Sequence, residues 1–229
     1  MKARRITFLL CAAVLLLSGC AAQADASPAA APEQKEAPPA SDRPLIVCMG
    51  DSITAGYGVY SDDEMYSAYL QELLGERARV IAYGTSGETL HEASVYASPA
   101  LNAGADTVLL QFGTNDASPA LFHADAFRAS VETLLDTHIE ALGAEHVVFL
   151  LPPSIYPSDG DLTSFGMSAE KLEQVRAILT EVCAAKGVAV VDLCAATADH
   201  PEWFPDGVHP NAAGNKAIAQ AIYDAVFAE

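Results

Sequence analysis

The chain has 229 residues, of which 51% are hydrophobic and 18% are charged. This length and composition fit one globular domain of ordinary size plus a segment outside it. Aspartate and glutamate outnumber lysine and arginine by 30 to 12, so the net charge is −18 at pH 7. A field of this sign repels polyanions, which disfavours nucleic acid and anionic lipid headgroups as partners and leaves neutral molecules unhindered.

The first 19 residues are typical of an export signal. Lys2, Arg4 and Arg5 precede an apolar run over residues 6–17. That run is shorter than the about 20 apolar residues of a membrane-spanning helix, and it has the charged and apolar regions of a signal peptide. We therefore expect residues 1–19 to be a signal peptide.

The end of this segment, Leu17-Ser18-Gly19-Cys20, resembles the lipobox of bacterial lipoproteins. The resemblance implies that Cys20 is lipidated, becomes the mature N-terminus and anchors an exported protein on the bacterial cell envelope. The membrane would then be contacted through the lipid anchor only. A plain secretory signal cleaved near Ala22 or Ala24 is the alternative.

Residues 20–43 are dominated by alanine, proline, serine, glutamate and glutamine. Such a segment buries too little apolar surface to offset its ordering entropy, so we expect a lipidated N-terminus followed by a disordered tether. The folded domain is expected at residues 44–229. Without the three basic residues of the signal, nine basic residues face 30 acidic ones, and the net charge becomes −21.

Within the domain, short β-type runs alternate with helix-length stretches, which predicts a parallel sheet covered by helices on both faces. The expected strands are Leu45–Met49, Arg79–Ala82, Thr107–Phe112, Val147–Leu151 and Val188–Leu193. The expected helices are Tyr66–Leu74, Ala124–Leu142, Ser168–Lys186 and Ala212–Phe227. Residues suited to helix caps are Gly75, Gly143 and Gly187 at the C-terminal ends and Asn211 at the start of the last helix.

The cysteines give no sign of a disulfide framework or a metal site. Cys48 lies in an apolar strand pattern and Cys183 on an expected helix, so buried thiols are the first expectation. A bridge between Cys183 and Cys194 stays open. Neither CxxC nor HExxH spacing occurs, and we expect no metal and no cofactor.

Three short motifs carry the candidate chemistry: Gly50-Asp51-Ser52, Gly113-Thr114-Asn115-Asp116 and Asp206-Gly207-Val208-His209-Pro210-Asn211. Ser52 offers a nucleophile, His209 a base, Asp206 a carboxylate that orients the base, and Asn115 a donor to an oxyanion. The first two motifs follow expected strands, where the ligands of parallel sheets gather. Each motif taken alone also has a structural explanation, such as a helix cap or an Asx turn.

Taken together, these blocks are similar to those of the SGNH (GDSL-type) hydrolase family, over essentially the whole domain. The resemblance implies a flavodoxin-like three-layer α/β/α sandwich around a central five-stranded parallel sheet. It implies a catalytic triad of Ser52, Asp206 and His209, and an oxyanion hole formed by Ser52, Gly87 and Asn115. The second block, residues 82–89, departs from the family by having alanine where asparagine is usual, which puts the bracing of that loop in doubt.

Other polar and aromatic residues receive lesser roles. Asp51 and Asp116 are expected to brace the site rather than act as acids. The remaining histidines lack a neighbouring carboxylate and nucleophile, so surface or structural roles are favoured. Loop residues expected around the site, as lining of an acyl or sugar pocket or as ordinary packing, are Tyr57, Tyr60, Ile155, Tyr156, Phe165, Met167, Trp203 and Phe204.

The resemblance implies a serine esterase that hydrolyses an ester through an acyl-enzyme. The stretch from His200 to Asn211 looks most like family members that remove O-acetyl groups from glycans, so the expected substrate is a short-acyl ester of a carbohydrate or another small neutral molecule. The alternatives are a lysophospholipase or short-chain lipase, an acyltransferase of the same fold, and a glycan-binding lipoprotein without turnover.

Overall fold

A computed structural model describes residues 42–158 and 160–228. The expected signal peptide, the lipidation site Cys20 and almost all of the expected tether lie outside the described residues. Within them, no helix has the length and apolar character to cross a membrane.

Five parallel strands form one sheet in the order β2-β1-β3-β4-β5. The strands are β1 (Leu45–Gly50), β2 (Arg79–Gly84), β3 (Thr107–Gln111), β4 (Val147–Leu151) and β5 (Ala189–Asp192). All five expected strands are present, and their ends differ from the expected ones by at most two residues. β1, β3 and β4 are buried almost throughout because helices cover both of their faces.

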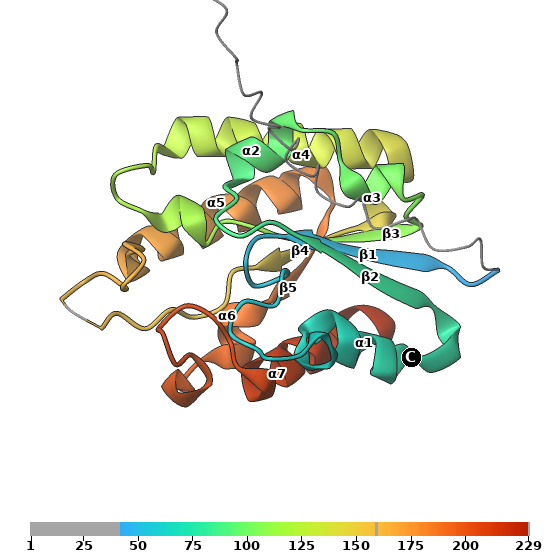
Figure 1. The fold of residues 1–229 in the computed structure, drawn as a ribbon. Helices are drawn as coiled ribbons and strands as arrows, with labels where there is room; N and C mark the ends of the chain where they lie inside the picture. Colours follow the sequence, from blue (N-terminus) through green and yellow to red (C-terminus); the bar gives the residue numbers. More distant parts are fainter. Residues whose placement is uncertain (1–41, 159, 229) are drawn as a thin grey trace, which may run out of the picture. The chain divides into compact units, whose positions relative to one another are not determined.

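Helices lie on both sides of the sheet, which confirms the predicted three-layer sandwich (Figure 1). One layer holds α2 (Leu90–Val95), α3 (Pro99–Asn102), α4 (Ala124–Leu142) and α5 (Ala169–Lys186), and the other holds α1 (Tyr66–Leu74), α6 (Leu193–Thr197) and α7 (Ala212–Ile222). Alternate residues of β1 point into the two cores: Val47 and Met49 pack with the first layer, Ile46 and Cys48 with the second.

The four expected helices are confirmed with small differences at their ends. Ser168 caps α5 instead of belonging to it, and the last helix is α-helical only to Ile222 before a π-helical turn at residues 223–227. The three expected C-cap glycines and the Asn211 N-cap are in place, and Oδ1 of Asn211 accepts hydrogen bonds from the first turn of α7.

Three short helices, α2, α3 and α6, were not predicted from the sequence. Each has four to six residues, too few for a helical period to be recognised. Side-chain caps begin all three. In α2 the cap is a full capping box, in which Thr89 and Glu92 each bond the other's backbone N–H.

The three cysteines in the described part of the chain are free. Cys48 and Cys183 are buried, as expected, and burial raises the pKa of each thiol to about 12. The alternative of a bridge between Cys183 and Cys194 is therefore wrong for this structure.

Candidate active site

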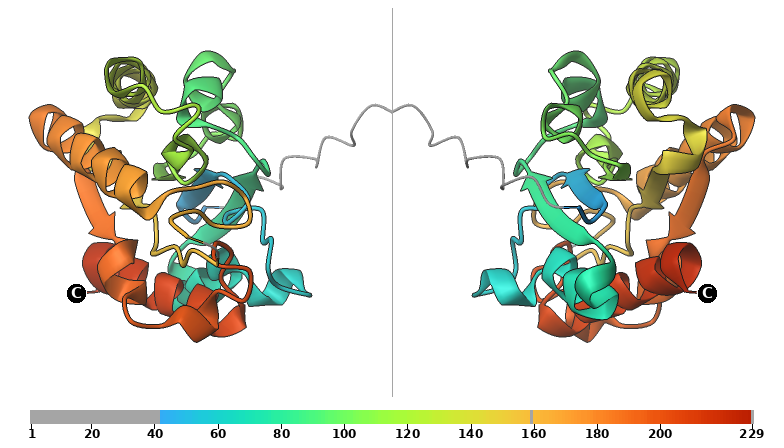
Figure 2. Two further views of the ribbon diagram at one scale, coloured as in Figure 1. Left: turned by 90° about the vertical axis from the view of Figure 1, so that its left-hand side faces the viewer. Right: turned by 90° about the vertical axis from the view of Figure 1, so that its right-hand side faces the viewer.

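The candidate residues meet at the carboxyl edge of the sheet, where the loops after the strands converge. The left view of Figure 2 looks onto this edge and shows the turn after β1, the long loop before α5 and the segment before α7 side by side. Ser52 and His209, which are 157 positions apart in the sequence, are hydrogen-bonded there.

Ser52 lies on a tight turn directly after β1, and two glycines make this turn possible. A Cβ on Gly50 would lie 2.5 Å from the carbonyl oxygen of Gln111, and one on Gly84 would lie 2.1 Å from the backbone nitrogen of Ala55. Both approaches are closer than any side chain tolerates. Gly50 therefore lets the end of β1 approach β3, and Gly84 lets the end of β2 approach the turn. Ser52 is 7% exposed at this edge of the sheet.

The Ser52 hydroxyl is paired with a histidine that is itself held by a carboxylate. Oγ of Ser52 lies 2.9 Å from Nε2 of His209, and Nδ1 of His209 lies 2.7 Å from Oδ2 of Asp206. With Nδ1–H donating to the carboxylate, Nε2 is left free to accept the serine proton. The sequence-predicted triad residues are thus brought together in the order serine, imidazole, carboxylate.

Asp206 is fixed by its own local turn. Its Oδ1 accepts hydrogen bonds from the backbone N–H groups of Val208 and His209, at 2.9 and 2.8 Å. Partial burial raises the pKa of this carboxyl, but the backbone donors and the imidazole lower it by more, so the pKa lies below its usual value. Asp206 is therefore ionised and orients the imidazole over the whole neutral range.

The expected oxyanion donors lie on the loops after β2 and β3. Nδ2 of Asn115 donates to the carbonyl oxygen of Glu88 at 2.9 Å, which uses one of its two N–H groups and leaves the other for a ligand. Gly87 has φ +84°, and a Cβ added there would meet no other atom within 4 Å. Glycine is required at this position by the left-handed backbone conformation rather than by crowding from the protein.

The loop carrying Gly87 is braced although the usual asparagine is replaced by Ala82. Ala82 lies inside β2, opposite Cys48 of β1. The bracing comes from the loop after β3, because the carboxylate of Asp116 accepts the backbone N–H of Leu90 at 3.0 Å. Burial raises the pKa of Asp116 to about 6.

Asp51 is fully buried behind the nucleophile. Its Oδ1 accepts the N–H of Ile53 at 2.9 Å. Burial raises the pKa of Asp51 to about 7, although the side chain of Thr114 lies close enough to the carboxyl to lower this pKa in part. A buried polar atom of β3, Nε2 of Gln111, is unpaired within the described chain.

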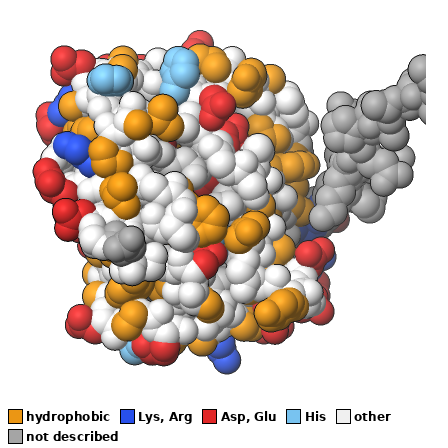
Figure 3. Space-filling view, turned by 60° about the vertical axis from the view of Figure 1, so that its left-hand side comes forward, with side chains coloured by type: hydrophobic (Ala, Val, Ile, Leu, Met, Phe, Trp, Pro, Cys, Tyr) orange, Lys and Arg blue, Asp and Glu red, His pale blue; other side chains and the backbone are white. Residues whose placement is uncertain are grey.

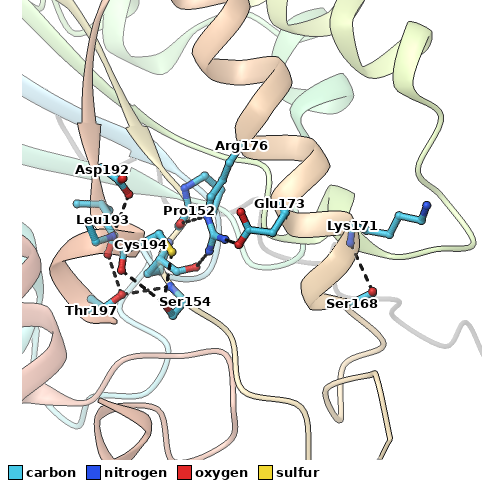
Figure 4. A network of polar contacts seen from close by, with 12 residues as sticks. Pro152, Ser154, Ser168, Lys171, Glu173, Arg176, Asp192, Leu193, Cys194 and Thr197 are labelled. Atoms are coloured by element: carbon cyan, nitrogen blue, oxygen red, sulfur yellow. Dashed lines mark hydrogen bonds and ion pairs between the residues drawn. The ribbon is translucent and has the colours of Figure 1, made fainter. Parts of the chain in front are cut away.

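The long loop between β4 and α5 is held by a buried arginine that sequence reasoning missed. Arg176, 8% exposed, donates to the carbonyl oxygens of Pro152 and Pro153 and pairs with Glu173 (Figure 4). Its position four residues after Leu172, on the apolar face of α5, was the signal available in the sequence. A guanidinium donates in several directions at once, so one side chain fixes the whole start of the loop.

The same loop reaches the Asp206 turn. Ser154 at its start receives support from Thr197 of α6, whose hydroxyl accepts the Ser154 N–H at 3.1 Å (Figure 4). Further along, the N–H of Tyr156 donates to the carbonyl oxygen of Gly207 at 2.8 Å. The loop therefore connects the buried arginine to the turn that carries the imidazole.

Two aromatic rings flank the imidazole. The ring centroid of Tyr57 lies 4.3 Å from that of His209, and the Phe165 ring stands perpendicular to the imidazole with the centroids 5.0 Å apart. Figure 3 shows that hydrophobic side chains are spread over this side of the molecule among acidic ones, with few basic side chains between them. The other loop residues expected around the site differ in solvent exposure. Ile155, Met167 and Phe204 are buried, whereas Tyr60 is fully exposed.

The other histidines have contacts outside this site. His138 is buried, with Nδ1 bonded to the carbonyl of Leu134 and Nε2 2.8 Å from Oγ of Ser98. Burial lowers the pKa of His138. His200 stacks on Trp203 at 3.7 Å. Within residues 42–158 and 160–228, no three His, Cys, Asp or Glu side chains are grouped to hold a metal ion.

Comparison with known proteins identifies this arrangement. A sequence model of the GDSL-like lipase/acylhydrolase family matches residues 48–217. The chain belongs to this family. The predicted enzyme class, an SGNH (GDSL-type) serine esterase, is thereby confirmed at the level of the family, and the match covers all three motifs.

Relatives agree with this assignment. The chain is 26% identical to an acetylxylan esterase of Xylanibacter ruminicola over 213 residues, which cover 82% of this chain and 44% of that protein. It therefore spans less than half the length of this curated relative. Among solved structures, a lipase/acylhydrolase from Enterococcus faecalis is 26% identical with a TM-score of 0.67, covering 79% of this chain and 94% of that one.

The SGNH hydrolase fold is also shared with more distant structures. The acetylxylan esterase Axe2 from Geobacillus stearothermophilus is 20% identical, with a TM-score of 0.66 over 81% of this chain and 95% of that chain. At this identity the likeness concerns the fold alone. The predicted fold class is confirmed by both the sheet order and these structures.

Proposed function

We propose that this protein hydrolyses esters with Ser52 as nucleophile, His209 as general base and acid, and Asp206 as the carboxylate that orients the imidazole. The observation that carries the proposal is the continuous chain of two hydrogen bonds, 2.9 Å from Oγ to Nε2 and 2.7 Å from Nδ1 to the carboxylate. This arrangement activates a hydroxyl that is otherwise a weak nucleophile near pH 7.

The reaction has two halves. Oγ of Ser52 attacks the ester carbonyl carbon while its proton passes to Nε2 of His209. The tetrahedral intermediate then collapses, the alcohol leaves with the proton from Nε2, and an acyl-enzyme remains. A water molecule attacks the acyl-enzyme, gives a proton to Nε2, and releases the carboxylic acid as that proton returns to Ser52.

In both halves of the reaction, hydrogen-bond donors must stabilise the negative charge that forms on the carbonyl oxygen. The backbone N–H groups of Ser52 and Gly87 and the free N–H of the Asn115 amide supply them in our proposal. Because Glu88 holds the Asn115 amide in place, the donor is oriented before the charge forms, and little reorganisation is needed.

The substrate we propose is a short-acyl ester, such as an O-acetyl group, on a carbohydrate or another small neutral molecule. Two observations support it: the acidic net charge of the chain, which disfavours anionic substrates, and the sequence similarity to an acetylxylan esterase. A lysophospholipase or lipase, an acyltransferase and a glycan-binding lipoprotein are the competing functions.

Hydrolysis of p-nitrophenyl acetate, butyrate and octanoate by the purified protein and its Ser52→Ala variant tests the proposal. We expect turnover that depends on Ser52 and falls with acyl chain length. Turnover that rises with chain length would favour a lipase. A folded protein without turnover on any ester would favour an acyltransferase or a binding protein.

We also propose that the protein is an exported lipoprotein anchored through Cys20, on the basis of the lipobox-like sequence of residues 17–20. Cells expressing the full chain and its Cys20→Ala variant would be labelled with radioactive palmitate and fractionated. Label and membrane association should both disappear in the variant. Unlabelled wild-type protein in the soluble fraction would instead indicate a plain secretory signal.

A further inference from the structure

Three exposed aromatic rings lie in and beside the candidate site. Tyr57 and Phe165, 52% and 45% exposed, contact each other edge to face with centroids 6.4 Å apart, and both contact His209. Tyr60 is fully exposed three residues further along the same turn. A cluster of large, solvent-exposed aromatic side chains commonly marks a binding surface.

Tyr57 and Tyr60 line a shared cavity. Its volume is about 450 Å³, and its lining also includes Ser86, the residue before the proposed oxyanion glycine. The cavity therefore extends from the ring that covers the imidazole out to Tyr60. Its lining residues are Ala55, Gly56, Tyr57, Gly58, Val59, Tyr60 and Ser86.

The segment that carries these rings is held against the site. The N–H of Tyr57 donates to the carbonyl oxygen of Ser52 at 2.9 Å, and the N–H of Tyr60 donates to the Glu64 carboxylate at 3.2 Å. Gly58 packs so closely that a Cβ there would lie 3.0 Å from Cβ of His209. The backbone that carries Tyr57 and Tyr60 is thus fixed before a ligand binds, which lowers the backbone entropy lost on binding.

The contacts of Tyr57 and Phe165 with His209 indicate which part of the ester these two rings would contact. In the proposed mechanism Nε2 of His209 gives its proton to the departing alcohol, so the alcohol lies beside the imidazole at that moment. The rings that flank the imidazole therefore face the alcohol side of the ester rather than the acyl side.

The chemistry of the cavity lining fits a neutral, ring-shaped alcohol. None of its seven lining residues carries a charged side chain, which gives a charged ligand no partner in this cavity. The rings of Tyr57 and Tyr60 provide apolar faces, whereas the hydroxyl groups of both tyrosines and of Ser86 provide hydrogen-bonding groups. A sugar ring has this combination, with apolar C–H faces and hydroxyl groups around its rim.

We propose that Tyr57, Tyr60 and Phe165 form a binding surface for the neutral sugar that carries the ester, with Tyr60 contacting the sugar outward from the reacting position. This inference rests on the proposed hydrolase function and assigns the leaving-group side of the same site.

Tyr60 is the residue to change, because its fully exposed side chain leaves the core untouched when removed. For Tyr60→Ala we measure kcat/KM on an O-acetylated xylo-oligosaccharide and on ethyl acetate, whose alcohol is too small to reach Tyr60. The ratio of the first value to the second should fall about 2- to 10-fold, as expected for loss of one ring contact. Tyr60→Phe should retain most of the ratio, and Leu121→Ala, which removes an exposed side chain at a different cavity, should leave it unchanged.

A binding measurement separates failure of this inference from failure of the hydrolase function. Calorimetric titration of the Ser52→Ala protein with xylotetraose should show binding that Tyr60→Ala weakens by a similar factor. Absence of binding, or a Tyr60→Ala ratio equal to wild type, would overturn the sugar surface even if small esters are hydrolysed. Binding that depends on Tyr60 without turnover of any ester would support the surface and refute the hydrolase.

Discussion

The side-chain amide of Asn115 donates to the backbone carbonyl of Glu88 at 2.9 Å, which ties the loop after β3 to the loop after β2. These two loops carry two of the three proposed oxyanion donors, Gly87 and Asn115. The third donor, Ser52, lies on the turn after β1. One hydrogen bond therefore fixes both the Asn115 amide and the loop of Gly87, so their separation is set before a substrate arrives.

Replacing Asn115 should consequently affect turnover more than stability. For Asn115→Ala we expect kcat on p-nitrophenyl acetate to fall about 100- to 1000-fold, as for loss of one oxyanion donor. Thr133→Ala removes another side-chain hydrogen bond to a backbone carbonyl, on an exposed part of α4, and serves as the control. A loss in Asn115→Ala no larger than in the control would remove Asn115 from the oxyanion hole.

Asp206→Asn should abolish most activity while keeping the fold. The asparagine oxygen can still accept the N–H groups of Val208 and His209, but its NH₂ group then faces Nδ1 and selects the wrong imidazole tautomer. We expect kcat to fall by about 10⁴ in a protein that still folds, with at most a modest loss of stability from the removed charge.

The control is Glu202→Gln, which alters a second carboxylate–histidine pair, the exposed contact with His200 at 2.8 Å. Its activity should equal that of wild type. If Asp206→Asn were equally active, another carboxylate, such as Asp51 or Asp116, would have to orient the imidazole.

Hydrolysis should require a neutral base at the Ser52 hydroxyl. The pKa of Asp206 lies below its usual value, so this carboxylate stays ionised as the pH is lowered from 8 to 5. The imidazole must be neutral to accept the Ser52 proton, and kcat/KM should therefore decline on acidification. A profile that stays flat to pH 5, measured with an ester stable over this range, would exclude His209 as the base.

Stability should depend on pH through Asp51. Its pKa is raised from 3.8 to about 7 in the folded protein, so between these values the folded state binds the extra proton. The free energy of unfolding must then decrease as the pH rises from about 4 to about 7, by at most about 4 kcal/mol from this group.

Asp51→Asn removes the titrating carboxyl. The free energy of unfolding of this variant, relative to that of wild type, should rise between pH about 4 and about 7 and stay constant at higher pH. Urea unfolding of both proteins at pH 5, 6, 7 and 8 gives the difference. Asp116, whose pKa is raised to about 6, titrates in both proteins and largely cancels. Parallel stability curves would mean that Asp51 is ionised in the folded protein at all four pH values.

Gly207→Ala should distort the turn that carries His209 more than an ordinary glycine-to-alanine substitution would. Gly207 has φ +83°, and a Cβ there would lie 2.3 Å from the carbonyl oxygen of Tyr156. Gly104 has φ +73° with nothing within 4 Å, so Gly104→Ala carries the backbone strain alone. Gly104→Ala should lose about 1 kcal/mol of stability from backbone strain. Gly207→Ala should lose more because of its added clash with Tyr156, and only this variant should also lose activity. Equal activity in the two would show that the Tyr156 contact is unimportant for the site.

Much of the fold could be predicted because strongly patterned segments leave few alternatives. β4, α1 and α4 have the expected bounds, since long amphipathic or continuously apolar runs are specified locally. The short helices α2, α3 and α6 were missed because four to six residues make fewer than two helical turns, too few to show the 3.6-residue period. The anchoring of the long loop by Arg176 was missed because its partners, two backbone carbonyls, have no side-chain signature.

The family, the parallel sheet and the identity of the candidate residues follow from the sequence alone, because each motif is a local pattern at a predictable edge of the sheet. The folded chain was needed to learn that Ser52 lies 2.9 Å from His209, that Asn115 is held by Glu88, and that the Tyr57 ring covers the imidazole. These contacts join segments far apart in the chain, and their distances depend on how the whole core packs. No local pattern encodes that packing.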